Sequence, residues 1–169
     1  MAPHRGWTPR EGVVEATVSA CPDPGFLTAV WLVGVEDASP DDSGEITVAE
    51  LFGDRVGPAA STVRCGVKAV NDPRLVTDLA DVDLPVDATR PHRYAAAWGE
   101  EGVGLYVDGR LVHAVGQTLR YPLQLLVDLF ELPGLDGDAG PRDPAAYPRT
   151  ARVHEVRAWR SPPRPSLPG

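Results

Sequence analysis

The sequence has 169 residues, of which 43% are hydrophobic, and its formal net charge is −8. This length is typical of one domain with a sizeable core. The negative charge argues against a nucleic-acid backbone or an anionic membrane surface as a partner. No apolar run approaches the roughly 18 residues that cross a bilayer. The 18 prolines and 17 glycines favour many short strands over long helices.

The two ends of the sequence carry little hydrophobic patterning. No apolar run follows the basic residues near Met1, so we expect no signal peptide and, for the chain as given, a cytoplasmic location. The proline-rich segment 161–169 is expected to be an extended tail. We therefore expect a single domain over residues 1–160, and a monomer.

Metal ligands and cofactors are not indicated by the spacing of candidate residues. Cys21 and Cys65 lack the spacing of a zinc site. A single disulfide between them is possible, but two buried thiols are the preferred interpretation. Asp37, Asp41 and Asp42 lie in a polar loop that could bind a structural calcium ion. Because these carboxylates lack EF-hand spacing, a solvated loop is expected instead.

Segments of strand length recur from residue 12 onward. Turn residues separate the strands predicted at 12–20, 26–35, 44–53, 61–70, 92–98, 103–107, 110–115, 121–131 and 151–159. The segment 74–90 is interpreted as a loop with one short strand. About eight to ten strands and no convincing helix predict an all-β fold, an antiparallel β-sandwich.

The strand predicted at 44–53 carries two carboxylates, Glu45 and Glu50, five positions apart. Regular alternation would place these side chains on opposite faces of the sheet. It would also put Leu51 out of phase with the other apolar residues. One extra residue at Val48–Ala49, a β-bulge, corrects both faults. The bulge then gathers four side chains on one face: Glu45, Thr47, Glu50 and Phe52.

Two glutamates on the open face of a sheet provide what glycoside hydrolysis requires, one proton donor and one nucleophile or base. The alternative interpretation is an edge strand with solvated acids. Side chains opposite apolar core faces, or of a type that stacks on sugars, are expected to line the same surface. These predicted substrate-binding residues are Trp31, Trp98, Gln124, Asp128 and Phe52.

Several motifs in one order resemble a known family. Gly44–Glu50 is similar to the glycoside hydrolase family 16 signature Glu-Ile-Asp-Ile-x-Glu in its bulged form. Gly25–Leu32 resembles the family's Gly-x-Trp-Pro-Ala-Phe-Trp-Leu, and His92–Trp98 resembles its His-x-Tyr-x-x-Glu-Trp. Tyr106–Gly109 falls where the family has an equivalent segment. The resemblance extends over residues of about 12 to 160.

This resemblance implies a concanavalin A-like β-jelly roll with a concave substrate cleft. Members of the family typically cleave β-glucans and galactans with retention of configuration and are usually secreted. The resemblance makes Glu45 the nucleophile and Glu50 the general acid/base. Their partner would be an oligosaccharide or polysaccharide.

The sequence also departs from the family pattern. Thr47 stands where the family has a central aspartate between the two acids, and Leu27 replaces its first tryptophan. Arg64 and Lys68 stand where laminarinase-like members carry histidines. The sequence therefore leaves two principal functions open, a retaining glycosidase with altered tuning and a non-catalytic carbohydrate-binding module. A purely structural sandwich is a third, weaker interpretation.

Overall fold

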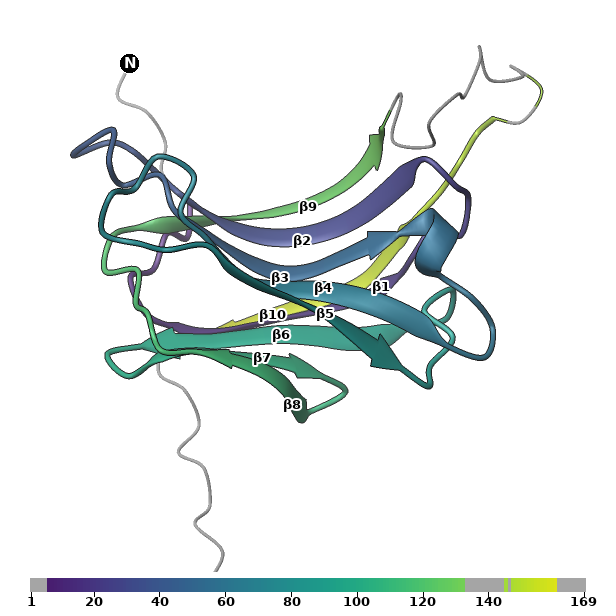
Figure 1. Ribbon diagram of the computed structural model, residues 1–169. Coiled ribbons are helices and arrows are strands. Elements are labelled where there is room, and N and C mark those ends of the chain that lie inside the picture. The colour runs from purple at the N-terminus through teal and green to yellow at the C-terminus, as the bar shows by residue number, and fades with distance from the viewer. Residues whose placement is uncertain (1–5, 133–144, 146, 161–169) are drawn as a thin grey trace, which may run out of the picture.

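The computed structural model describes residues 6–132, 145 and 147–160 as an antiparallel β-sandwich of two five-stranded sheets. The sheets lie one above the other in Figure 1. The predicted tail at 161–169 lies outside the described residues. Within the described part, no helix is long and apolar enough to cross a membrane. The all-β sandwich expected from the sequence is confirmed.

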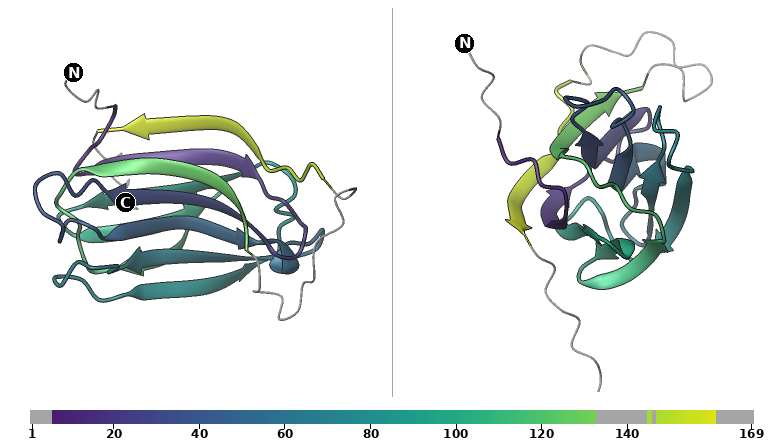
Figure 2. Two further views of the ribbon diagram at one scale, coloured as in Figure 1. Left: turned by 90° about the horizontal axis from the view of Figure 1, so that it is seen from above. Right: turned by 90° about the vertical axis from the view of Figure 1, so that its left-hand side faces the viewer.

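One sheet consists of β10 (Arg152–Trp159), β1 (Gly12–Ser19), β6 (His92–Gly99), β7 (Gly102–Val107) and β8 (Arg110–Val115), in that order. Strand β10 pairs only with β1 among the described strands, so it forms an edge of this sheet. Figure 2 shows β10 at this edge from two sides.

The second sheet has the order β5 (Asp78–Leu84), β4 (Ser61–Lys68), β3 (Glu45–Phe52), β2 (Phe26–Gly34) and β9 (Leu123–Glu131). A 3-10 turn, η1 (Gly53–Arg55), follows β3. In Figure 1 this sheet bends so that its outer face, turned away from the first sheet, is concave. We call this the concave face.

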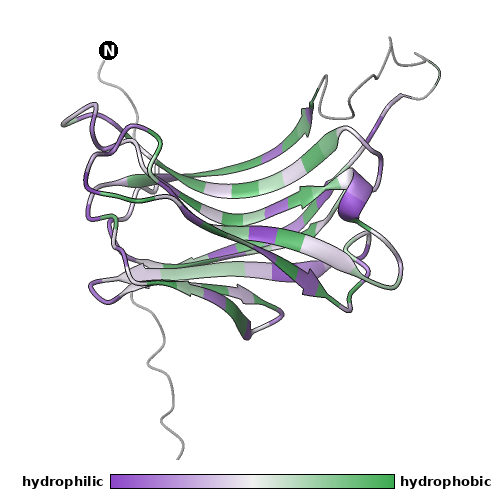
Figure 3. Ribbon diagram, in the orientation of Figure 1, coloured by the Kyte–Doolittle hydropathy of each residue, from purple (hydrophilic) through white to green (hydrophobic). Residues whose placement is uncertain are grey.

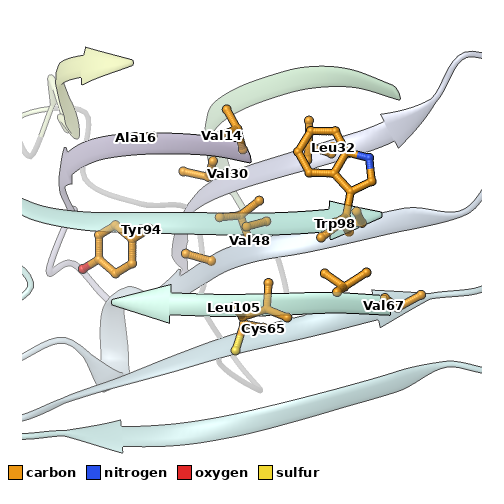
Figure 4. Packing of buried hydrophobic residues seen from close by; sticks show 14 of the residues in the cluster. Val14, Ala16, Val30, Leu32, Val48, Cys65, Val67, Tyr94, Trp98 and Leu105 are labelled. Atoms are coloured by element: carbon orange, nitrogen blue, oxygen red, sulfur yellow. The ribbon is translucent and has the colours of Figure 1, made fainter. Parts of the chain in front are cut away.

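The core fills the space between the two sheets. Each strand with period-two alternation buries its apolar side chains between the sheets. Figure 3 shows hydrophobic and hydrophilic residues interspersed along these strands. Val14 from β1, Val30 from β2, Val48 from β3 and Leu105 from β7 are at most 1% exposed. Figure 4 shows these side chains meeting between the sheets. The outer face of the second sheet is left to carry polar side chains.

Strand β5 is longer than the short strand predicted within 74–90. It runs for seven residues and pairs with β4 along its length, for example Asp81 with Arg64 and Asp83 with Thr62. Alternating aspartates make the segment look like a loop in the sequence. They are accommodated because β5 is an edge strand whose aspartates bond to polar groups on β4.

Candidate active site

A β-bulge in β3 places the two acids on the concave face. Thr47 pairs with Trp31 of β2, whereas Glu50 pairs with Ala29, so the register shifts by one residue between them. The register against β4 shifts in the same interval. The extra residue is at Val48–Ala49, where both side chains are buried in the core. The bulge predicted from the sequence is therefore present at the predicted position.

Glu45 and Glu50 meet at one ammonium group, that of Lys68. The Lys68 Nζ lies 2.5 Å from Glu50 Oε1 and 3.1 Å from Glu45 Oε1. The two carboxylate oxygens cannot be farther apart than the sum of these distances, about 5.6 Å. The two acids thus face the same point in space, although their positions in the strand are five residues apart.

Thr47 orients one of these carboxylates. Its hydroxyl donates a hydrogen bond to Glu45 Oε1 at 2.7 Å, and its side chain is fully buried. The hydroxyl and the Lys68 ammonium therefore converge on the same oxygen of Glu45. A bound oxygen of this kind is fixed in place, which leaves the other oxygen of Glu45 free for a different contact.

The charge on Lys68 is stabilised by the acids. Burial opposes this charge, but the hydrogen bond to Glu50 and the charges of Glu45 and Glu50 outweigh burial and raise the pKa of Lys68. The ammonium also lies 5.5 Å from the centroid of the Trp31 ring, within the range of a cation–π contact. Lys68 therefore places a positive charge between the two acids.

The structure places three of the predicted binding residues on the concave face beside the acids. Trp31 pairs directly with Thr47, and its ring lies 5.3 Å from that of Phe130. Asp128 is separated from Glu50 by Ala29 alone. Gln124 is separated from Glu45 in the same way by Val33 of β2, and it is exposed.

Phe52 lies on the concave face at the end of β3, beyond Glu50. The guanidinium carbons of Arg64 and Arg55 lie 5.1 Å and 6.0 Å from its ring centroid. Asp81 on β5 holds both arginines, at 2.7 Å in each case. A cavity of about 200 Å³ opens here, lined by Gly25, Phe26, Phe52, Asp54, Arg55, Arg64 and Leu132. This cavity lies beside the acids rather than over them.

Trp98 does not belong to the site, contrary to the sequence prediction. It lies on β6 in the other sheet and is 1% exposed within the hydrophobic core. Its ring makes an edge contact with Trp7 at 6.5 Å between centroids. Strand β6 is apolar on both faces around Ala95–Ala97, so alternation could not show which side of the strand faces the core.

Comparison with known proteins gives the chain a family. The model of "Glycosyl hydrolases family 16" matches residues 10–127, which is well over half of the sequence. The chain belongs to glycosyl hydrolase family 16. A search of curated proteins finds none that matches the sequence.

Solved structures of several glycosidases share the family 16 fold of this chain. A Clostridium perfringens endo-β-galactosidase that releases GlcNAcα1-4Gal has a TM-score of 0.74 at 21% identity, covering 92% of this chain and 40% of its own. The Bacillus licheniformis β-glucanase has a TM-score of 0.70 at 21% identity, with coverages of 89% and 67%. The laminarinase catalytic domain of Thermotoga maritima has a TM-score of 0.69 at 18% identity, covering 90% of this chain and 64% of its own. This family 16 chain thus spans between two fifths and two thirds of these structures.

The cysteines and the acidic loop of this family 16 chain do not form part of the site. Cys21 and Cys65 are both buried free thiols, as preferred from the sequence. In the acidic loop, Asp42 forms an ion pair with Arg74 at 2.8 Å. Among the described residues, no group of three or more histidine, cysteine or acidic side chains is arranged to hold a metal ion.

Lys68 was not among the site residues predicted from the sequence, although it stands where laminarinase-like members carry histidines. In the structure it lies directly opposite Glu45, in the register that pairs β3 with β4. Two signals were available. Lys68 is the only lysine in the sequence, and its strand follows the acidic strand through a short connection.

Proposed function

We propose that this chain hydrolyses β-linked glycans of the glucan or galactan type with retention of configuration, Glu45 acting as nucleophile and Glu50 as general acid/base. The observation that carries the proposal is the convergence of both carboxylates on Lys68, which limits the separation of two of their oxygens to about 5.6 Å. Retaining glycosidases have carboxyl groups about 5–5.5 Å apart, whereas inverting enzymes leave about 6.5–9.5 Å for a water molecule. Membership of family 16 supports the same reaction class.

The roles of the two acids follow from their surroundings. Thr47 and Lys68 fix one oxygen of Glu45, which favours a carboxylate held in place to attack an anomeric carbon. Glu50 has 5% of its side chain exposed, so a proton held there would be shielded from bulk water. In the first step Glu50 gives its proton to the glycosidic oxygen, the bond from that oxygen to the anomeric carbon breaks, and Glu45 forms a bond to the same carbon as the leaving sugar departs. Water then attacks the anomeric carbon, its bond to Glu45 breaks, and Glu50 accepts a proton from that water.

Sugar rings would bind along the concave face. The Trp31 ring offers an apolar surface for the C–H groups of a sugar, and Gln124 and Asp128 offer hydrogen bonds to hydroxyl groups. Phe52 and the cavity of about 200 Å³ beside it extend this row away from Glu50. These positions come from three neighbouring strands, β9, β2 and β3.

The test is release of reducing sugar from a panel of β-glucans and β-galactans, together with binding measured by calorimetry. We expect the wild-type protein to hydrolyse at least one glycan and the first product to keep its β-configuration by NMR. Glu45→Gln should abolish turnover and leave binding intact, because the amide keeps the shape but cannot attack. Glu101→Gln, in the turn between β6 and β7, is the matched control and should behave as wild type.

A carbohydrate-binding module without turnover is the second candidate function. The ion pairs of Lys68 favour it, because they bind both acids in the described structure. Measurable glycan binding with no hydrolysis by the wild-type protein would support this alternative. Equal hydrolysis by wild type and Glu45→Gln would contradict the assignment of the nucleophile.

A further inference from the structure

The only lysine of this sequence lies between the two acids of the candidate site. The other 15 cationic side chains counted with it are arginines. Lys68 pairs directly across from Glu45, and its Nζ contacts Glu45 and Glu50 at once. A cation at this point contacts one oxygen of each of the two acids that the proposed reaction uses.

The exposure of the three side chains shows what must move before a sugar can reach the acids. The Glu50 side chain is 5% exposed and that of Glu45 13%, whereas that of Lys68 is 28% exposed. Lys68 is thus the side chain of this cluster that is most open to solvent. A glycan that contacts the Lys68-bound oxygens of both carboxylates has to take the place of the ammonium.

In the part of the chain that the structure describes, the charges around Glu50 do not provide another cation that could replace Lys68. On β4, Arg64 pairs across from Glu50, but Asp81 of β5 binds its guanidinium at 2.7 Å and 3.2 Å. On β9, Asp128 lies on the other side, separated from Glu50 by Ala29. Among the described residues, Lys68 forms the one ion pair of Glu50, and Arg64 adds a weaker attraction to the charge of Glu50.

A glycosidase acid must carry a proton at the start of the reaction, and a short ion pair with an ammonium favours the charged carboxylate instead. We propose that Lys68 locks the unbound site by pairing with both acids, and that a bound glycan displaces its ammonium so that Glu50 can take up the proton needed for cleavage. This inference rests on the proposed function and identifies Lys68 as the residue that controls the proposed hydrolysis. Glu50 would take this proton from solvent and pass it to the glycosidic oxygen.

Displacement can be observed without any catalytic activity, because selective labelling with ¹³C-lysine produces signals from one residue only. In the unbound protein we expect the Lys68 ¹³Cε signal to titrate at a pH above that of an ordinary lysine. Glu50→Gln should lower this midpoint, because the variant removes the strongest partner of the ammonium. Saturating amounts of a β-1,3-glucan tetrasaccharide or a β-1,4-galactan tetrasaccharide should shift the Lys68 signal. They should also lower its titration midpoint, as Glu50→Gln does. A glycan that binds by calorimetry without moving the signal would overturn the displacement.

The effect on the reaction is tested by the pH dependence of hydrolysis. Lys68→Met removes the charge and keeps the length, so the alkaline limb of the kcat/KM profile, which reports the unbound enzyme, should move to higher pH by about 1–3 pH units. Lys68→Arg retains a cation and should leave that limb within a fraction of a unit of wild type. An unchanged profile for Lys68→Met, with the variant shown to be folded by circular dichroism, would overturn the proposal. If no variant hydrolyses any glycan while a bound glycan still moves the lysine signal, the displacement stands and the proposed hydrolysis fails.

Discussion

The hydroxyl of Thr47 donates a 2.7 Å hydrogen bond to Glu45, the acid two residues before it on the same face of β3. The threonine therefore holds the neighbouring carboxylate. Unlike an aspartate, it adds no negative charge. Three charged groups remain in the centre, two carboxylates and one ammonium.

Thr47→Asp should increase hydrolysis at neutral pH. A further carboxylate beside Glu45 and Glu50 competes for Lys68 and favours keeping a proton on one of the acids. A change equivalent to one pKa unit corresponds to roughly a tenfold change in the protonated fraction. Thr47→Asn is the uncharged control, and turnover numbers of both variants on the same glycan provide the measurement. Equal effects of aspartate and asparagine would contradict the electrostatic explanation.

Trp31→Ala should weaken glycan binding about tenfold, because aromatic stacking contributes about 0.5–1.5 kcal/mol beyond buried area. Calorimetry with the glycan that binds wild type most tightly is the measurement. Trp98→Phe is the control from the core. It should lower the melting temperature and leave the affinity unchanged, since Trp98 is 1% exposed on the other sheet. A loss of affinity in Trp98→Phe alone would reverse the placement of the two tryptophans.

Gly66→Ala should destabilise the fold by more than about 2 kcal/mol. Gly66 has φ of +146°, and an added Cβ would lie 2.1 Å from the backbone oxygen of Asp78 on β5. A backbone atom of a paired strand cannot move aside as a flexible side chain can. Gly99→Ala is the matched control, because nothing lies within 4 Å of its added Cβ. Urea denaturation of both variants gives the comparison, and similar losses in the two would count against this explanation.

Asp81→Asn should reduce stability at neutral pH but not in strong acid. The hydrogen bond from Arg64, together with Arg55, lowers the pKa of Asp81 to about 2 from an ordinary 3.8. Since the folded protein holds the ionised form, the stabilisation is complete above pH 3.8 and is lost as the pH falls through 2. The free energy of unfolding of wild type and variant should therefore differ above about pH 5 and converge near pH 2. A difference independent of pH would show that the carboxylate charge is not its cause.

The sequence allowed the bulge to be predicted because alternation is a local property. Glu45 and Glu50 can share the polar face, and Leu51 can lie on the apolar face, only if the strand contains one extra residue. This conclusion requires no knowledge of the neighbouring strands. The same parity placed Gln124 and Asp128 opposite the core face of β9. Where one face of a strand is clearly apolar, the sequence defines the other face.

Position across strands could not be predicted in the same way. Trp98 was assigned to the site by its type, since its strand has small apolar residues on both faces. The contact of Lys68 with both acids depends on the register between β3 and β4, which no pattern within either strand determines. The aspartates of β5 concealed a strand because their partners, Arg64 and Thr62, lie on its neighbour.

The bulge at Val48–Ala49 has a consequence for changes in chain length. Removing Ala49 would leave Glu45 and Glu50 four positions apart, an even number, so a regular strand would still present both on the concave face. Ile46, Val48 and Leu51 would still point into the core. Loss of this one residue would therefore keep every other side chain of β3 on its present face of the sheet. The two acids would then lie on a regular strand without a bulge. Deletion of a single residue from unbulged β2 would instead reverse the sides of all the residues that follow it in that strand. Strand β3 can therefore lose one residue at its bulge without exchanging its core-facing and outward-facing side chains.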